Sequence, residues 1–149
     1  GLFEGATINT PSMLCVEDYL LALDWAESIG GCEGLKARSD ESLKIIEDWV
    51  ETSDAFGHLC EDASVRSNTG VCLKVTHPQI TALDDDAQAA FVKKLVGKVE
   101  KEGVAYDFNG YRDAPAGLRI WCGATVEPSD VAKLLPWIDW AFATTLSEL

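Results

Sequence analysis

Residues 71–76, with the sequence VCLKVT, decide the fold, because apolar side chains alternate with Cys, Lys and Thr along them. A period of two predicts a strand with one buried face, which ends before Pro78 because proline cannot donate to a sheet. Residues 118–122 alternate in the same way and predict a second strand. Residues 104–108 are a third, short candidate. These strands predict a small, mainly antiparallel sheet.

Helical patterns lie on both sides of these strands. Thr10-Pro11 predicts the start of a first helix, since Thr can cap the free N–H groups and Pro suits the first helical position. Gly30-Gly31 ends that helix. Further helices are predicted over about residues 35–51, 84–103 and 127–145. This order predicts an α+β domain with helices packed on one face of the sheet.

The composition and net charge argue against some classes of function. The 149 residues include 12 Lys and Arg against 25 Asp and Glu, a formal net charge of −13. Such a charge repels phosphate backbones, so nucleic-acid binding is not expected. No stretch approaches about 18 apolar residues and no signal-peptide pattern occurs, so we expect no membrane span. Five widely spaced cysteines predict free thiols and a cytoplasmic location.

Motifs for metal binding and hydrolysis are weak. Residues 58–62, with the sequence HLCED, gather potential ligands, but neighbours in sequence do not make a coordination geometry, and we predict no metal site. The aspartates at 84–86 lack the spacing and the central glycine of a calcium loop, which favours helix capping. The chain has no phosphate-binding GxxxxGK motif and no GxSxG elbow.

Two features suggest anion binding. Asn9-Thr10-Pro11 offers a helix start with free N–H groups and two donor side chains, although a plain Thr cap is the simpler interpretation. Arg112 lies in a loop, and Arg119 lies inside an apolar strand. Pleating places Arg119 and Trp121 on one face, where the guanidinium can bind a carboxylate with two hydrogen bonds. An ion pair with a local acid such as Asp113 is the alternative, and the residues alone favour it.

Three segments of the sequence resemble those of a known family. They are residues 5–19 (GATINTPSMLCVEDY), 66–69 (RSNT) and 111–125 (YRDAPAGLRIWCGAT). Together they resemble the phosphoserine aminotransferases, most of all the bacterial-type branch, over essentially the whole chain. The resemblance implies a homodimeric class V enzyme of fold-type I that depends on pyridoxal 5'-phosphate. Such an enzyme converts 3-phosphohydroxypyruvate and glutamate into phosphoserine and 2-oxoglutarate in serine biosynthesis.

The resemblance also implies that this chain is the carboxy-terminal part of such an enzyme. The family's Schiff-base lysine lies in the large domain, and none of the eight lysines here sits in a matching motif. Residues 1–30 would be a connecting segment and long helix from the large domain, and residues 31–149 the small α+β domain. No catalytic residue is expected in this chain, which alone should not transaminate.

Four residues take roles from the resemblance. Asn9 and Thr10 match the segment that reaches across the dimer to the cofactor phosphate of the other subunit. Arg119 matches the small-domain arginine that binds the substrate α-carboxylate. Arg112 stands where many relatives have a histidine near the distal phosphate or carboxylate of the substrate, and a positive charge there still fits an anion.

Other interpretations stay open. The chain could be part of a related class V aminotransferase with a different substrate, since substrate choice depends partly on residues absent here. It could also be a free-standing module in which Arg112 and Arg119 bind a small dicarboxylate, or a dimerisation element.

Overall fold

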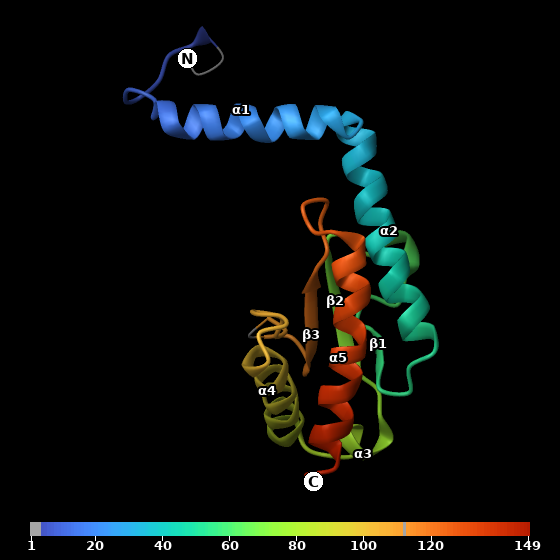
Figure 1. Cartoon of the computed structure of the whole chain (residues 1–149). Helices are drawn as coiled ribbons and strands as arrows, with labels where there is room; N and C mark the ends of the chain where they lie inside the picture. The colour runs from blue at the N-terminus through green and yellow to red at the C-terminus, as the bar shows by residue number, and fades with distance from the viewer. Residues whose placement is uncertain (1–3, 112) are drawn as a thin grey trace. The chain divides into compact units, whose positions relative to one another are not determined.

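The computed structural model describes residues 4–111 and 113–149. The chain forms two compact units, one up to Lys36 and one from Ala37 onward. Figure 1 shows the elements in chain order. They are α1 (Met13–Ser28), α2 (Gly31–Glu51), β1 (Phe56–His58), η2 (Ala63–Val65), β2 (Gly70–Val75), α3 (Pro78–Thr81), α4 (Asp85–Lys101), β3 (Gly117–Trp121) and α5 (Pro128–Leu146). Helix α2 runs through both units, and the predicted division after residue 30 stays a prediction.

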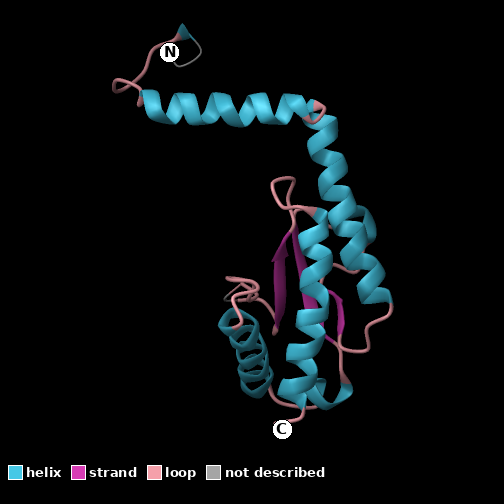
Figure 2. Ribbon diagram, in the orientation of Figure 1, coloured by secondary structure: helices cyan, strands magenta, loops and turns pink. Residues whose placement is uncertain are grey.

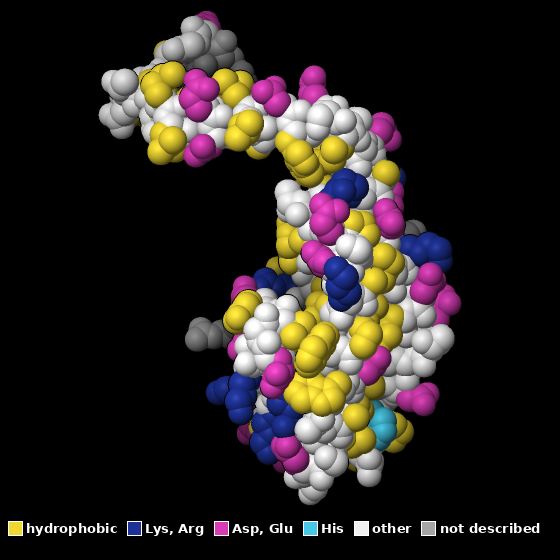
Figure 3. Space-filling model, in the orientation of Figure 1, with side chains coloured by type: hydrophobic (Ala, Val, Ile, Leu, Met, Phe, Trp, Pro, Cys, Tyr) yellow, Lys and Arg dark blue, Asp and Glu magenta, His cyan; other side chains and the backbone are white. Residues whose placement is uncertain are grey.

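Helix α1 begins later than predicted. Its N-cap is Ser12, whose Oγ accepts a hydrogen bond from the N–H of Cys15 at 3.5 Å, so the predicted Thr10 cap is wrong. Ser and Thr are both good caps, so the sequence alone does not decide between them. The predicted end is confirmed, because Gly30 follows the helix with a φ of +103°, a conformation that favours glycine. No side chain of α1 is buried, and Figure 3 shows hydrophobic and acidic side chains mixed along it.

Helix α2 begins four residues before the predicted start at Leu35 and ends at Glu51, as predicted. The early start has a simple cause: Gly30 and Gly31, both with positive φ, turn the chain within two residues, and the helix resumes at once. The predicted buried face is confirmed in the second unit, where Ile46 is fully buried. The last turns of α2 therefore belong to the core of that unit.

Among the described residues, three antiparallel strands form the sheet, in the order β1-β2-β3. The two strands predicted from alternation are confirmed as β2 and β3, and every second residue of β2 is buried. The third prediction, residues 104–108, is wrong. In that segment the carbonyl of Phe108 accepts a hydrogen bond from the N–H of Arg119 at 2.9 Å. An isolated bridge between Asn109 and Leu118 follows it.

Helices α4 and α5 pack against one face of the sheet (Figure 2). Helix α4 starts at an Asp84 cap that accepts from the N–H of Ala87 at 2.8 Å, and Gly103 ends it with a φ of +71°, as predicted. The two helices and the sheet bury Leu95 and Ile138 completely. The predicted α+β architecture, with helices on one face of a small antiparallel sheet, is confirmed. Within the described residues, no helix has the length and apolar character needed to cross a membrane.

Candidate anion-binding site

The face of the sheet opposite the helices carries the candidate site. In β3 the side chains of Leu118 and Ile120 are buried in the core. Trp121 is 62% exposed, and the Arg119 side chain is 27% exposed. The predicted pleat is therefore confirmed. Arg119 stands opposite Cys72 of β2, so its backbone is held in a paired strand.

Two side chains contact the guanidinium of Arg119. Its Nη2 donates to Oδ2 of Asp107 at 3.3 Å, and its Cζ lies 4.5 Å from the centre of the Tyr111 ring. The local acid is therefore Asp107 and not Asp113, because residues 107 and 108 run beside β3. Hydrogen bonding to Tyr111 is the main cause that raises the pKa of Arg119 above its already high ordinary value. The side chain is a permanent cation held between a ring and a carboxylate.

A pocket of about 710 Å³ opens beside this guanidinium. It is lined by Ser67, Thr69, Gly70, Tyr106, Asp107, Tyr111, Arg119 and Trp121. The Oγ of Ser67 accepts hydrogen bonds from the N–H groups of Thr69 at 3.3 Å and Gly70 at 3.2 Å, which orders one rim. On the other side the indole of Trp121 lies over Gly123, where a Cβ would come within 2.6 Å of the ring. Among the described residues that line it, the pocket thus combines one guanidinium and one carboxylate with hydroxyl groups and aromatic walls.

The rim around Ser67 is tied to helix α2. Arg66 forms an ion pair with Glu47, and Nδ2 of Asn68 donates to Oδ1 of Asp40 at 2.9 Å. Sequence reasoning used residues 66–69 only for the family resemblance and did not place them at the site. Their spacing alone does not reveal it, because the contacts join α2 to a loop 19 and 28 residues further on.

The remaining predicted site residues are Asn9, Thr10 and Arg112. Asn9 and Thr10 lie in the first unit, ahead of α1, and both are exposed. No hydrogen bond or ion pair of either side chain is found within the described part of the chain. Arg112 lies outside the described residues, and its predicted role stays a prediction.

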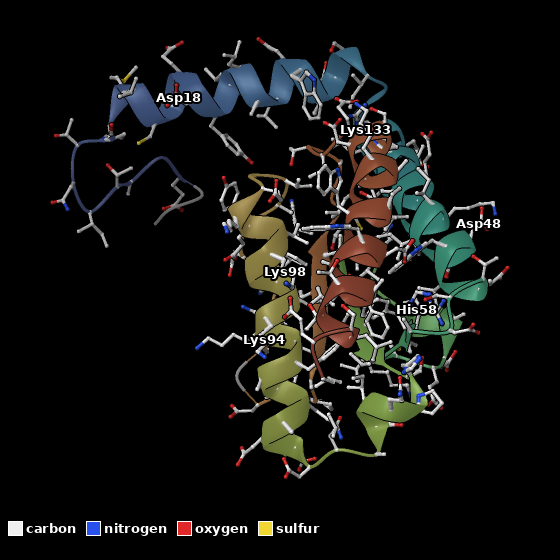
Figure 4. All side chains as sticks on the ribbon, turned by 60° about the horizontal axis from the view of Figure 1, so that its bottom comes forward. Asp18, Asp48, His58, Lys94, Lys98 and Lys133 are labelled. Atoms are coloured by element: carbon white, nitrogen blue, oxygen red, sulfur yellow. The ribbon has the colours of Figure 1, made fainter. Side chains whose placement is uncertain are left out.

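The lysines lie on several elements of the chain, and Lys74 of β2 pairs with Glu61 at 2.7 Å. Lys94 and Lys98 sit on α4 and Lys133 sits on α5 (Figure 4). Lys98 pairs with Glu148 at 2.6 Å, and Lys133 pairs with Asp130 at 3.0 Å. Of the residues described as lining the Arg119 pocket, none is a lysine. The pocket can hold an anion, but it presents no amine that could form a covalent bond to a carbonyl compound.

The two histidines do not gather metal ligands. Across residues 4–111 and 113–149 no group of three His, Cys, Asp or Glu side chains is close enough to hold a metal ion. His58 in β1 is partly buried, and burial, followed by the charge of Arg66, lowers the pKa of its imidazole. The lowered pKa favours the uncharged form of this imidazole at neutral pH. We find no chemistry for residues 58–62 beyond a polar edge of the sheet.

All five cysteines are free thiols, as predicted, and they should differ in reactivity. Cys122 follows β3 and is fully buried, and burial raises the pKa of its thiol to about 11. At pH 8 only about one part in 1,000 is then the reactive thiolate. We expect iodoacetamide at pH 8 to modify the exposed Cys15 and Cys32 and to leave Cys122 unmodified until urea unfolds the chain, as measured by mass spectrometry. Equal rates in the native chain would contradict this burial.

Comparison with solved structures identifies the class of fold. A phosphoserine aminotransferase from Bacillus circulans subsp. alkalophilus matches with a TM-score of 0.74 at 21% identity, over 91% of this chain and 34% of that one. A phosphoserine aminotransferase from Trichomonas vaginalis matches with a TM-score of 0.72 at 19% identity, over 93% and 36%. The fold of this chain is therefore similar to that of about one third of each of these structures.

Curated sequences similar to this chain include two phosphoserine aminotransferases. Phosphoserine aminotransferases of Methanosarcina barkeri and Methanosarcina mazei are 48% and 47% identical to this chain over 141 residues. The alignments cover 95% of this chain and 35% of each relative, so the chain spans about a third of their length. A scan against models of protein families finds no match. The predicted resemblance is confirmed: this sequence matches part of a phosphoserine aminotransferase.

Proposed function

We propose that this chain is the carboxy-terminal part of an enzyme that transfers the amino group of glutamate to 3-phosphohydroxypyruvate, giving phosphoserine for serine biosynthesis. The observation that carries the proposal is the alignment of 95% of this chain, at 48% identity, with 35% of a relative named phosphoserine aminotransferase. The pocket beside Arg119 supports it, because both substrates carry a carboxylate that a guanidinium can bind.

In this proposal Arg119 binds the α-carboxylate of both substrates in turn. The guanidinium is fixed by strand β3 and by Tyr111, so a carboxylate entering the pocket meets a cation already in place. The hydroxyl groups of the rim, on Ser67 and Thr69, can donate to a second anionic group. Arg112, beyond the described residues, would add charge for the distal phosphate. The role of this chain is to hold and orient substrates.

Pyridoxal 5'-phosphate is the cofactor we propose for the whole enzyme, and one of the similar structures is described as bound to it. The cofactor supplies the electron sink for amino transfer when it is bound. Asn9 and Thr10 fit a contact to its phosphate, because both side chains are exposed and can donate hydrogen bonds. No lysine is among the described residues that line the pocket, and we propose that the cofactor-binding lysine lies in another part of the enzyme.

A homodimer and a cytoplasmic location complete the proposal. The exposed apolar side chains of α1, such as Leu14, Tyr19 and Leu21, are 66–71% exposed in this chain and need a cover in the whole protein. The rest of the subunit and a second subunit would provide it, with Asn9 and Thr10 reaching the cofactor of that second subunit. Five free thiols are consistent with the reducing cytoplasm.

The test is an assay of the full-length polypeptide that contains this chain. We expect it to form phosphoserine from 3-phosphohydroxypyruvate only when glutamate and pyridoxal phosphate are present. The 149-residue chain alone should be inactive and should give no stoichiometric absorbance change when titrated with pyridoxal phosphate. A coding sequence with an initiator codon at Gly1, or full activity of the chain alone, would contradict the proposal.

A further inference from the structure

We propose that Asp107 is an internal competitor for the substrate carboxylate at Arg119, and that a bound carboxylate displaces it. This inference rests on the proposed role of Arg119 in substrate binding. The side chain of Asp107 already places one carboxylate oxygen 3.3 Å from Nη2 of Arg119. A ligand carboxylate needs the same guanidinium, so the two carboxylates compete for it.

The two partners differ in how firmly they are held. Arg119 lies in a paired strand, is 27% exposed and packs on the Tyr111 ring at 4.5 Å. The Asp107 side chain is 90% exposed and lies in a turn, and its carboxylate has no other hydrogen bond or ion pair among the described residues. When a ligand arrives, the aspartate can rotate into water while the arginine stays in place. The guanidinium of Arg119 is therefore the group that binds the ligand, and the Asp107 carboxylate is the partner that the ligand displaces.

The geometry of the pair favours displacement. Asp107 uses one oxygen and one long hydrogen bond, whereas a free carboxylate can form two parallel bonds with a guanidinium. An exposed ion pair of this kind contributes little in water. A ligand carboxylate therefore replaces Asp107 at a modest cost, and the negative charge that remains nearby weakens the binding of the ligand.

The side chain can be changed without disturbing the turn. Asp107 has a φ of +52°, and Asn is, like Asp, enriched in this left-handed region. The backbone N–H of Asp107 donates to Oε1 of Glu100 at 3.4 Å, a contact that does not involve the carboxylate. Asp107→Asn thus removes the charge and keeps the shape.

The experiment titrates the 149-residue chain with 2-oxoglutarate and follows the indole N–H of Trp121, which lines the pocket, by NMR. We expect Asp107→Asn to lower the dissociation constant about two- to fivefold, and the gain to shrink in 0.5 M NaCl because salt screens exposed charges. Asp113→Asn, a matched loss of charge without contact to Arg119, should bind as the unchanged chain does. Arg119→Gln should abolish the shift.

The outcomes distinguish a failure of the inference from a failure of the proposed role of Arg119. Loss of binding in Arg119→Gln together with an unchanged or weaker dissociation constant in Asp107→Asn overturns the inference and leaves the proposed function standing. Binding by Arg119→Gln at the original affinity removes the proposed role of Arg119 in substrate binding, and the inference with it. A gain in Asp107→Asn that salt does not alter, an equal gain in Asp113→Asn, or no binding by any of these chains also overturns the role of Asp107.

Discussion

Gly117→Ala should destabilise the second unit by about 3 kcal/mol, the upper end for inserting a group into a packed region. Gly117 begins β3, and a Cβ there would lie 1.9 Å from the carbonyl oxygen of Leu73 and 3.2 Å from the Cα of Lys74. Both are backbone atoms of β2, so no side-chain rotation can make room. The strands must separate, which also disturbs the pairing of Arg119 with Cys72. Urea unfolding of the 149-residue chain measures the loss.

Gly70→Ala is the matched control for this prediction. Gly70 begins β2 in the same sheet, but a Cβ built there would meet no atom within 4 Å. Its free energy of unfolding should stay within about 1 kcal/mol of the original, in the range of ordinary Gly-to-Ala changes. Equal unfolding free energies for Gly117→Ala and Gly70→Ala would show that the close approach of β2 and β3 at residue 117 is not as described.

Arg119→Lys should lower kcat/KM for glutamate about 10- to 100-fold in the full-length enzyme. A lysine keeps the positive charge but loses the planar fork that forms two parallel bonds with a carboxylate. It also loses the flat contact with the Tyr111 ring, which lies 4.5 Å from the guanidinium carbon. Because both substrates use the same guanidinium in the proposed function, kcat/KM for the phosphorylated keto acid should fall by a similar factor. Steady-state kinetics with each substrate varied in turn measures both.

Arg38→Lys controls for the general effect of losing an arginine. Arg38 donates from Nε to the carbonyl of Ala124 at 2.8 Å and from Nη2 to Glu127 at 2.7 Å, and it does not line the Arg119 pocket. This variant should keep its glutamate kinetics close to the original. Unchanged glutamate kinetics in Arg119→Lys would show that Arg119 does not bind the substrate carboxylate.

Long, regular patterns made most of the fold predictable. The alternation of β2 and the capped, amphipathic α4 follow from local sequence alone, because burial on one face imposes a period on each of them. The strand that was missed and the strand that was wrongly predicted have physical explanations. Strand β1 has three residues, too few for a period to appear. Residues 104–108 alternate, but Phe108 is buried beside β3 while Tyr106 lines the pocket, so the alternation reflects two different environments and not a strand.

Only the part of the candidate site that lies on strand β3 could be predicted from the sequence. Pleating places Arg119 and Trp121 on the open face, and that follows from the order of residues. The partner of Arg119 does not follow, because Asp107 and Asp113 are both near in sequence and only the path of the loop chooses between them. The hydroxyl rim at Ser67 and Thr69 depends on contacts with α2 that sequence spacing does not encode.

The close approach of Trp121 and Gly123 links two positions of the sequence. A methyl group on residue 123 and an indole ring on residue 121 would need the same space, since they would come within 2.6 Å. A side chain at position 123 therefore requires a smaller residue at position 121 or a different orientation of its ring. The two positions should vary as a pair among related sequences, and the aromatic wall of the pocket persists only where the glycine does.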